Sequence, residues 1–211
     1  MTAPGLFIVL EGLDGAGTTT QAERLGQMLR KQGRKVLITR EPSDGPLGLL
    51  IRQALTGRLG MPGGKGPLSQ QTLALMFAAD RMDHLEAQVH PALQAGVTVI
   101  CDRYLLSSLA YQGATVPMEW VNELNREATS PDLTLFVGVD VETASKRRAI
   151  RGGDPELFDA DEKQAKIREQ YAEAIKLLQK KERIVHIDGT AGIDDVTDAC
   201  WAEIAKLLPK G

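Results

Sequence analysis

The sequence predicts an α/β protein in three layers, with a five-stranded parallel sheet that is covered by helices on both faces. Short apolar runs alternate with amphipathic segments along the whole chain, which is the pattern of strand–helix units in a parallel sheet. The 211 residues, of which 43% are hydrophobic, suffice for one such core but hardly for two. We therefore expect a single domain over residues 1–211.

Each expected strand is a short apolar run, and each expected helix is a longer stretch with apolar residues every three or four positions. The strands are expected at residues 6–10, 36–39, 97–101, 133–139 and 184–187. The helices are expected at residues 19–32, 47–56, 69–94, 107–112, 117–129, 141–150, 161–180 and 194–208. Glycine and proline predict loops at residues 57–67 and 151–160. The second loop ends at Asp161, which can cap the next helix with Gln164 at the N3 position.

Charge and cysteine content argue against several classes of protein. The formal net charge of −3 does not suit a general nucleic-acid-binding protein, which needs a basic surface. Cys101 and Cys200 are too few for a disulfide framework, and a reducing compartment fits them. The chain begins without the pattern of a signal peptide, and no apolar run approaches the ~20 residues that span a bilayer. We expect a cytoplasmic protein with neither nucleic acid nor a membrane as partner.

A glycine-rich loop after the first expected strand predicts a phosphate-binding site. Residues 12–19 read GLDGAGTT and have the spacing of GxxxxGK[ST], in which backbone N–H groups and a helix N-terminus surround phosphate oxygens. The nucleotide contacts are expected at Gly12, Leu13, Asp14, Gly15, Ala16, Gly17, Thr18, Thr19 and Thr20. The Thr19 hydroxyl stands where the motif binds Mg²⁺. We therefore expect the three-layer P-loop NTPase fold, although a glycine-rich turn without a ligand is the alternative for the loop alone.

The lysine of this motif is absent, because Thr18 occupies its place. Another cation must then supply the missing positive charge. Arg147, Arg148 and Arg151 flank the second loop, and a mobile lid over residues 147–160 would carry them to the transferred phosphoryl group. Their alternative role is to complement the dipole at a solvated helix end.

Four further segments resemble the thymidylate kinase family over nearly the whole chain. They are TREP at residues 39–42 with Arg52 downstream, FAADR at 77–81, DRY at 102–104 with SSLAYQG at 107–113, and the lid-like segment 147–153. Their combination and order are more specific than the glycine loop. The resemblance implies a kinase that transfers the γ-phosphoryl group of ATP to the 5′-phosphate of dTMP with Mg²⁺, on the route to dTTP.

The same segments contain residue types that suit the acceptor phosphate. Arg40, Arg52 and Arg103 are guanidinium groups that can make bidentate contacts with a phosphate dianion. By resemblance, Glu41 helps to orient the nucleotide and holds an arginine in place. A surface ion pair is the alternative for Arg40 and Glu41, but both directly follow an expected strand, where α/β sheets bind ligands.

Phe77 and Arg81 lie four residues apart, so they share one helix face and can contact the same small ligand. By resemblance, Phe77 stacks on thymine and Arg81 forms a hydrogen bond with its O4 atom. Ser108 and Gln112 would face the polar edge of the base. Core packing is the alternative for Phe77 alone.

The expected reaction needs no general base, because the second pKa of a phosphate monoester is near ~6. Catalysis would consist of aligning two phosphates and neutralising their charge, through Mg²⁺, the loop amides, Arg103 and the lid arginines. Asp102 ends an apolar strand and is expected to hold Mg²⁺ through water. By resemblance, Asp14 faces the acceptor sugar and the metal. Both aspartates could instead act as cap or turn residues.

Two other functions stay open from the sequence. Another nucleoside monophosphate kinase would share the loop but bind a different base, and a non-catalytic nucleotide-binding protein would follow from the loss of the lysine. The base of ATP is expected near residues 189–192. The family resemblance also implies a homodimer, for which the apolar faces of residues 73–85 and 107–112 would serve, unless they cover the sheet.

Overall fold

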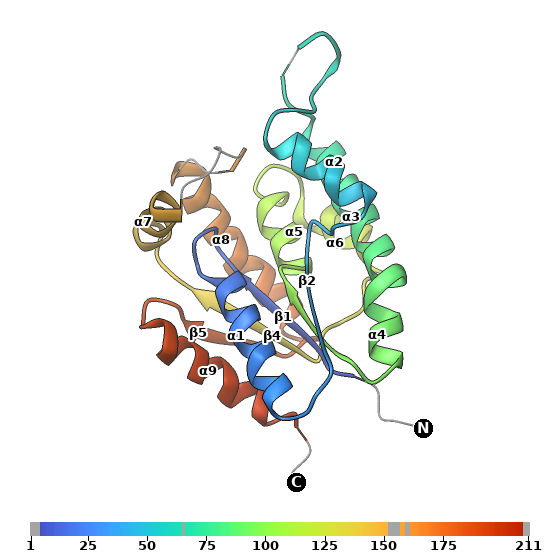
Figure 1. The fold of residues 1–211 in the computed structure, drawn as a ribbon. Coiled ribbons are helices and arrows are strands. Elements are labelled where there is room, and N and C mark those ends of the chain that lie inside the picture. Colours follow the sequence, from blue (N-terminus) through green and yellow to red (C-terminus); the bar gives the residue numbers. More distant parts are fainter. Residues whose placement is uncertain (1–4, 65, 152–156, 159–160, 209–211) are drawn as a thin grey trace.

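The computed structural model describes residues 5–64, 66–151, 157–158 and 161–208, with only the backbone of Arg151 and Asp161. Its centre is a five-stranded sheet of parallel strands in the order β2-β3-β1-β4-β5 (Figure 1). The strands are β1 (Phe7–Gly12), β2 (Val36–Arg40), β3 (Thr98–Asp102), β4 (Leu133–Gly138) and β5 (Ile184–Asp188). All five predicted strands are therefore found, and the predicted fold class is confirmed.

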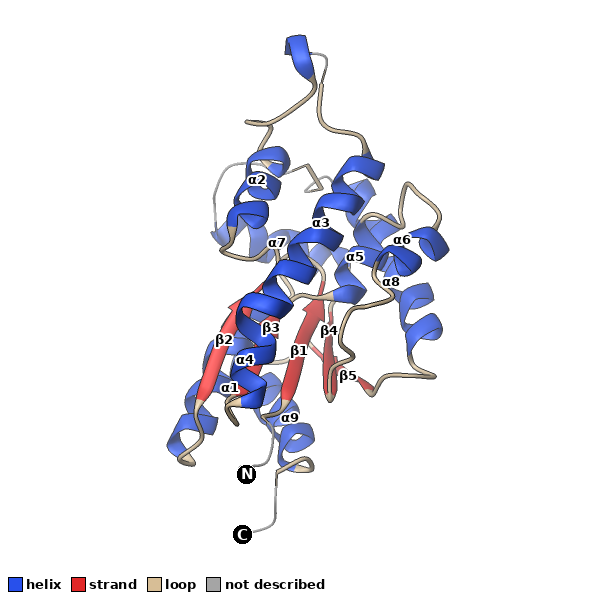
Figure 2. Cartoon of the chain, turned by 90° about the vertical axis from the view of Figure 1, so that its right-hand side faces the viewer, coloured by secondary structure: helices blue, strands red, loops and turns tan. Residues whose placement is uncertain are grey.

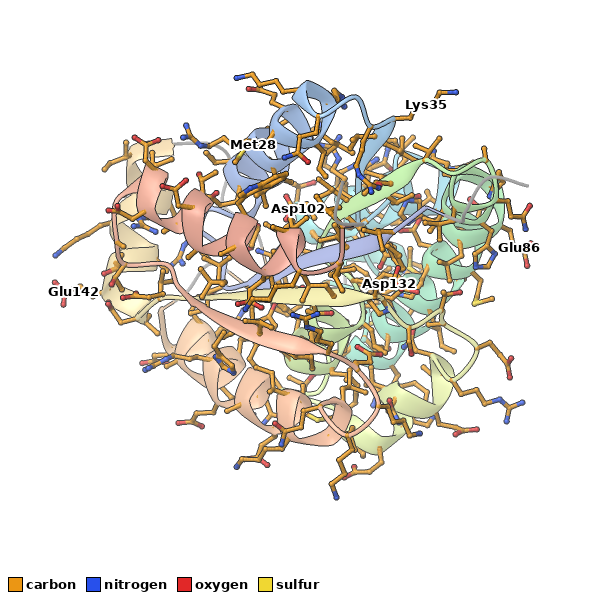
Figure 3. The ribbon with its side chains drawn as sticks, turned by 90° about the horizontal axis from the view of Figure 1, so that it is seen from below. Met28, Lys35, Glu86, Asp102, Asp132 and Glu142 are labelled. Carbon is orange, nitrogen blue, oxygen red and sulfur yellow. The ribbon has the colours of Figure 1, made fainter. Side chains whose placement is uncertain are left out.

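Helices cover both faces of this sheet. They are α1 (Thr18–Lys31), α2 (Pro46–Leu55), α3 (Gln70–His84), α4 (His90–Gln94), α5 (Leu105–Tyr111), α6 (Met118–Leu124), α7 (Val141–Arg151), α8 (Asp161–Leu178) and α9 (Ile193–Ala205). Helices α1 and α9 pack on one face, whereas α5 and α8 lie on the other (Figure 3). The central strands β1 and β3 are buried throughout, as expected for strands covered on both sides.

The predicted helix at residues 69–94 is present, but it contains a wider turn. Helix α3 continues into a π-helical turn, Leu85–Val89, and then into α4. Pro91 has no N–H group and cannot donate to the preceding turn, so a change in the hydrogen-bond ladder at this point is expected on physical grounds. The periodicity of the apolar residues does not reveal such a local change.

Two other helices differ from their predicted bounds because of side-chain contacts that the apolar periodicity does not reveal. Helix α5 begins at Leu105, two residues early, where the Glu11 carboxylate of β1 accepts hydrogen bonds from the backbone N–H groups of Tyr104 (2.8 Å) and Ser107 (3.1 Å). Helix α6 ends at Leu124 rather than near residue 129. Its C-cap, Asn125, donates its side-chain amide to the Val121 carbonyl at 2.8 Å.

The described part of the predicted loop at residues 57–67 extends from α2 and α3 away from the sheet (Figure 1). It contains one short 3-10 turn, Pro62–Gly64, and an isolated antiparallel bridge between Gly60 and Pro67. None of the helices in the described part of the chain is long and apolar enough to cross a membrane. In Figure 2 the carboxyl ends of β1 and β3 point toward the region of α2, α5 and α7, and the candidate site lies at this edge.

Candidate active site

The glycine-rich loop joins β1 to α1 and touches α7. Gly17 is the N-cap of α1 and has a φ of 95°, and Gly15 has a φ of 93°, both in the left-handed region that favours glycine. A Cβ atom on Gly15 would lie 2.4 Å from the carbonyl oxygen of Ala144 in α7. The absence of a side chain at Gly15 thus lets α7 approach the loop.

The side chains of the loop divide into two groups. Leu13, Ala16 and Thr18 are buried, so Leu13 and Ala16 can offer a ligand only their backbone atoms. Thr18, which stands in the lysine position, is 5% exposed. Thr19 and Thr20 are exposed at the start of α1. The loop therefore has the backbone and the hydroxyl of the motif but no cation of its own.

The two predicted metal-binding residues lie together. Thr19 Oγ1 donates a hydrogen bond to Asp102 Oδ2 at 2.5 Å, and Asp102 lies near the centre of the molecule in Figure 3. The second oxygen, Asp102 Oδ1, is buried and has no hydrogen-bond partner in the structure. Within the described ranges, no group of three or more His, Cys, Asp or Glu residues could hold a metal ion. An unpaired carboxylate oxygen beside a hydroxyl suits a Mg²⁺ ion that takes its other ligands from water and phosphate.

Arg103 directly follows Asp102 and lies beside the loop. Its φ of 72° is the one positive value among the described non-glycine residues, and such a conformation costs about 1–3 kcal/mol. The guanidinium donates to the Gly12 carbonyl at 2.8 Å and to Asp14 Oδ1 at 2.5 Å, and it lies 5.4 Å from the Tyr111 ring centroid. These contacts hold a backbone conformation that the local sequence does not favour.

Two of the predicted lid arginines reach the loop from α7. Arg148 Nη1 donates to the Asp14 carbonyl at 2.8 Å. Arg147 Nη1 donates to the Gly189 carbonyl at 2.8 Å and lies 3.5 Å from the Ala16 carbonyl. Arg147 thus connects the glycine loop to residues 189–192, which were expected near the base of ATP.

The rest of the predicted lid is only partly described. The side chain of Arg151 and residues 152–156 and 159–160 lie outside the described part of the chain. Between these ranges, the backbone N–H of Leu157 donates to the Leu55 carbonyl at the end of α2, at 3.0 Å. This segment therefore contacts the opposite side of the cavity described next.

A cavity of about 220 Å³ lies between the loop, α2, α3 and α5. Its lining includes nine of the predicted site residues, namely Asp14, Arg40, Glu41, Phe77, Arg81, Asp102, Arg103, Ser108 and Gln112. Leu55, Tyr104, Ser107, Tyr111 and Phe158 also line it. Side chains far apart in the sequence thus meet in one cavity beside the loop.

At one end of the cavity a buried arginine is held by three partners. Arg81 is 1% exposed. Its Nε and Nη2 atoms lie 2.9 and 2.7 Å from Glu41 Oε2, Nη2 donates to Ser108 Oγ at 2.9 Å, and Nη1 donates to Asn125 Oδ1. The arginine that Glu41 contacts is therefore Arg81. Asn125 was not predicted, and no local motif marks it.

Gln112 and Phe77 complete this end of the cavity. Gln112 is 1% exposed, and its Oε1 atom is buried without a hydrogen-bond partner. A buried acceptor of this kind is costly unless a ligand donates to it. Phe77 is half-buried and lines the cavity, so core packing does not account for its position.

The other two arginines expected at the acceptor phosphate differ from each other. Arg40 lines the cavity and donates to Asp44 Oδ1 at 2.8 Å. Arg52 is not among the lining residues, because its Nη1 donates to the carbonyls of Pro42 (2.9 Å) and Ser43 (2.7 Å). Arg52 Nη2 lies 3.7 Å from the same Asp44 oxygen. The structure thus brings Arg40, but not Arg52, to the cavity wall.

Several residues of the site were missed by the sequence analysis. Glu11 is fully buried, and this burial raises its pKa above the usual 4.5, while hydrogen bonds from Ser107 and the charge of Arg103 oppose the shift. An acidic residue at the end of an apolar run could have indicated it. Tyr171 in α8, whose hydroxyl lies 3.3 Å from Glu11 Oε2, carries no such signal.

Gln164 also has a different role from the predicted one. Instead of the expected capping contact, its Nε2 donates to Asp14 Oδ2 at 3.2 Å and to the Phe158 carbonyl at 2.9 Å. The side chain of its expected partner, Asp161, lies outside the described residues. The Oε1 atom of Gln164, which a capping contact would use, is buried without a hydrogen-bond partner.

The parallel sheet, the glycine loop and the Thr19–Asp102 pair define the class as a P-loop phosphotransferase. The sequence model of the family described as thymidylate kinase matches residues 10–200. The chain is 40% identical over 205 residues to a probable thymidylate kinase of Pyrococcus abyssi, covering 97% of this chain and 98% of the relative. This chain belongs to the thymidylate kinase family.

Bacterial relatives agree with this family assignment. The chain is 38% identical over 212 residues to a thymidylate kinase of Thermomicrobium roseum, with 97% of each chain covered. It is 38% identical over 208 residues to that of Bifidobacterium longum, covering 96% of this chain and 98% of the relative. The family and the type of enzyme predicted from the motifs, a thymidylate kinase-type phosphotransferase, are thus confirmed.

Proposed function

We propose that the protein transfers the γ-phosphoryl group of Mg-ATP to the 5′-phosphate of dTMP and releases dTDP and ADP. The observation that carries this proposal is the position of Arg103. Its guanidinium donates to Gly12 and Asp14 of the glycine loop. Arg103 also lines the same cavity as Asp102, Arg81 and Gln112. A group at this point can contact both phosphates when they meet.

The buried end of the cavity has hydrogen-bonding groups that match thymine. The Gln112 Oε1 acceptor needs a donor, and the N3–H group of thymine is one. Ser108 Oγ accepts from Arg81, so its own hydroxyl proton can be donated to O4. Arg81 Nη1 carries a second N–H besides the one given to Asn125, and Phe77 would stack on the ring. Cytosine would leave the Gln112 acceptor unpaired, and such a site discriminates strongly.

The acceptor phosphate would lie at Arg40 and Arg103. Both are cavity residues, and guanidinium groups bind phosphate oxygens in a bidentate manner. Arg52 would add positive charge from outside the cavity wall while it holds the Pro42 and Ser43 carbonyls. Asp14, which accepts from Arg103, would orient this guanidinium and face the acceptor sugar.

The donor phosphates would be bound by backbone N–H groups of the loop, and Thr19 and Asp102 would hold Mg²⁺. The ion, when bound, neutralises the charge of the β- and γ-phosphates. We propose that Arg147 and Arg148 replace the missing lysine, because both already touch the loop. Arg151 belongs to the same proposed lid over residues 147–160, and residues 189–192 would contact adenine.

Turnover of the purified chain tests this function. With Mg-ATP present, the formation of dTDP should exceed the formation of diphosphate products from dUMP and from CMP, and EDTA should abolish it. A faster rate with dUMP or CMP would replace the proposed substrate. Failure to form any diphosphate product would favour the second candidate, a non-catalytic nucleotide-binding protein, which the buried Thr18 in the lysine position supports.

We also propose a homodimer, although one of the two expected faces is already covered. The apolar side chains of α5 are buried beneath the other elements of the same chain. Leu75 in α3 and Leu49 in α2, however, are 51% and 53% exposed, and these two helices pack together. Light scattering after gel filtration should give twice the mass of one chain, and replacement of Leu75 by Glu should halve it.

A further inference from the structure

Helix α8 carries two buried polar side chains that contact the proposed transfer centre. Gln164 and Tyr171 are 0% and 1% exposed, and they lie about two turns apart on one helix face. Helix α8 also packs against α5, the helix that follows Arg103. The two side chains therefore approach from the α8 side and contact residues that line the cavity.

The Tyr171 hydroxyl lies among four polar groups, two from β1, one from α5 and one from Arg103. It donates to the Gly12 carbonyl at 2.9 Å and lies 2.9 Å from Ser107 Oγ. Arg103 Nη1 donates to it at 3.3 Å, and Glu11 Oε2 is also at 3.3 Å. One phenol oxygen thus connects the end of β1, the start of α5 and the Arg103 guanidinium.

Gln164 supports the other partner of the same guanidinium. Its amide donates to Asp14 Oδ2 at 3.2 Å, while Asp14 Oδ1 accepts from Arg103 Nη2 at 2.5 Å. Arg103 is therefore fixed by α8 in two ways, directly at Nη1 by Tyr171 and indirectly at Nη2 through Asp14. Its φ of 72° makes these contacts necessary, since the backbone alone disfavours this orientation.

We propose that Tyr171 is a positioning residue for phosphoryl transfer, whose hydroxyl holds the Arg103 guanidinium in place against the glycine loop. The inference rests on the proposed function, in which Arg103 contacts the phosphates. The ring of Tyr171 packs on Phe136 with centroids 5.1 Å apart, and a phenylalanine keeps this packing. Loss of the hydroxyl removes an acceptor from Arg103 and a donor from Gly12, so the guanidinium gains freedom without loss of charge.

The test is the variant Tyr171→Phe, measured with dTMP and Mg-ATP. We expect kcat to fall about three- to tenfold, as for the loss of one hydrogen bond, whereas KM for both substrates changes less than twofold. The control is Thr129→Val, which removes a hydroxyl that is hydrogen-bonded to His90 at 2.7 Å. Thr129 precedes β4 and so lies near the amino ends of the strands, at the edge of the sheet opposite the cavity. Thr129→Val should lower Tm by about as much as Tyr171→Phe does, but it should leave kcat unchanged.

A double-mutant cycle separates a positioning role from a structural one. In an Arg103→Ala background, Tyr171→Phe should lower kcat no further, because the group that it positions is absent. A kcat of Tyr171→Phe within twofold of the wild type, or an equal loss in both backgrounds, would overturn the inference and leave the proposed function intact. A wild-type chain without dTMP kinase activity would overturn both.

Discussion

Two buried carboxylates, Glu11 beside the glycine loop and Glu41 at the base end of the cavity, have different kinds of partner. Glu41 is 5% exposed and forms an ion pair with Arg81, with His84 Nδ1 3.2 Å from its other oxygen. Glu11 is 0% exposed and accepts hydrogen bonds from neutral groups, among them Ser107 Oγ at 2.5 Å. Glu41 thus has a cation as its direct partner, whereas the direct hydrogen-bond partners of Glu11 are neutral groups.

The difference matches the ligand parts that the two regions would receive. At the base end, Glu41 balances the charge of Arg81, so this end can offer hydrogen bonds to an uncharged base. At the phosphate end, Arg103, Arg147 and Arg148 donate to carbonyl oxygens. Phosphate oxygens can replace these acceptors, and the gain in charge pairing then favours the bound state.

The largest expected effect tests whether a guanidinium replaces the lysine. Arg148→Ala should lower kcat by about 10²-fold, as for other groups that stabilise transition-state charge, and Thr18→Lys in the same chain should restore part of it. Lys146→Ala is the control, because Lys146 is an exposed cation of the same helix paired with Glu142. Full activity in both Arg148→Ala and Arg147→Ala would mean that α7 does not supply the missing charge.

The next effect concerns the base end. Gln112→Leu removes the unpaired Oε1 acceptor, and kcat/KM for dTMP should fall about 10-fold or more, as for a lost hydrogen bond to a buried group. The ratio of dTMP to dCMP turnover should fall as well, because leucine does not distinguish the two pyrimidine edges. A reduced rate with an unchanged ratio would assign the discrimination to Arg81 and Ser108 instead.

The unlike partners of the two carboxylates also predict a pH effect on stability. Burial raises the pKa of Glu11 above 4.5, so the native state keeps a proton that the unfolded chain releases just above this pH. The free energy of unfolding therefore falls as the pH rises from 4.5 to the native pKa of Glu11, and it levels off above that pKa. In Glu11→Gln this contribution disappears. Urea unfolding of the wild type and of Glu11→Gln at several pH values above 4.5 measures this contribution. The same pH dependence of the free energy of unfolding in both proteins would contradict the prediction.

The smallest expected effect lies at the rim of the phosphate end. The Arg40 hydrogen bond lowers the pKa of Asp44 below its usual 3.8, so Asp44 is an anion that a bound phosphate must displace from Arg40. Asp44→Asn should tighten dTMP binding about twofold, since exposed ion pairs contribute ~0.2–1 kcal/mol. Isothermal titration calorimetry measures the affinity. Weaker binding would show instead that Asp44 holds Arg40 toward the ligand.

The sequence predicted what depends on local pattern. The five strands, the glycine loop and the residues at the strand ends, such as Asp102 and Arg103, follow from apolar runs and motif spacing. Glu11 as a cap of α5, Asn125 as a partner of Arg81 and Tyr171 at the loop were missed, because each depends on contacts between distant segments. Gln164 shows the same limit, since its hydrogen bond to Asp14 joins segments that are far apart in the sequence.

The close approach of α7 to Gly15 has one more consequence. The reach of Arg147 and Arg148 depends on the absence of a Cβ atom at Gly15, since such an atom would lie 2.4 Å from the Ala144 carbonyl oxygen. Even alanine at this position would lift the helix and withdraw both cations together. The proposed replacement of the lysine by Arg147 and Arg148 therefore depends on a glycine at position 15.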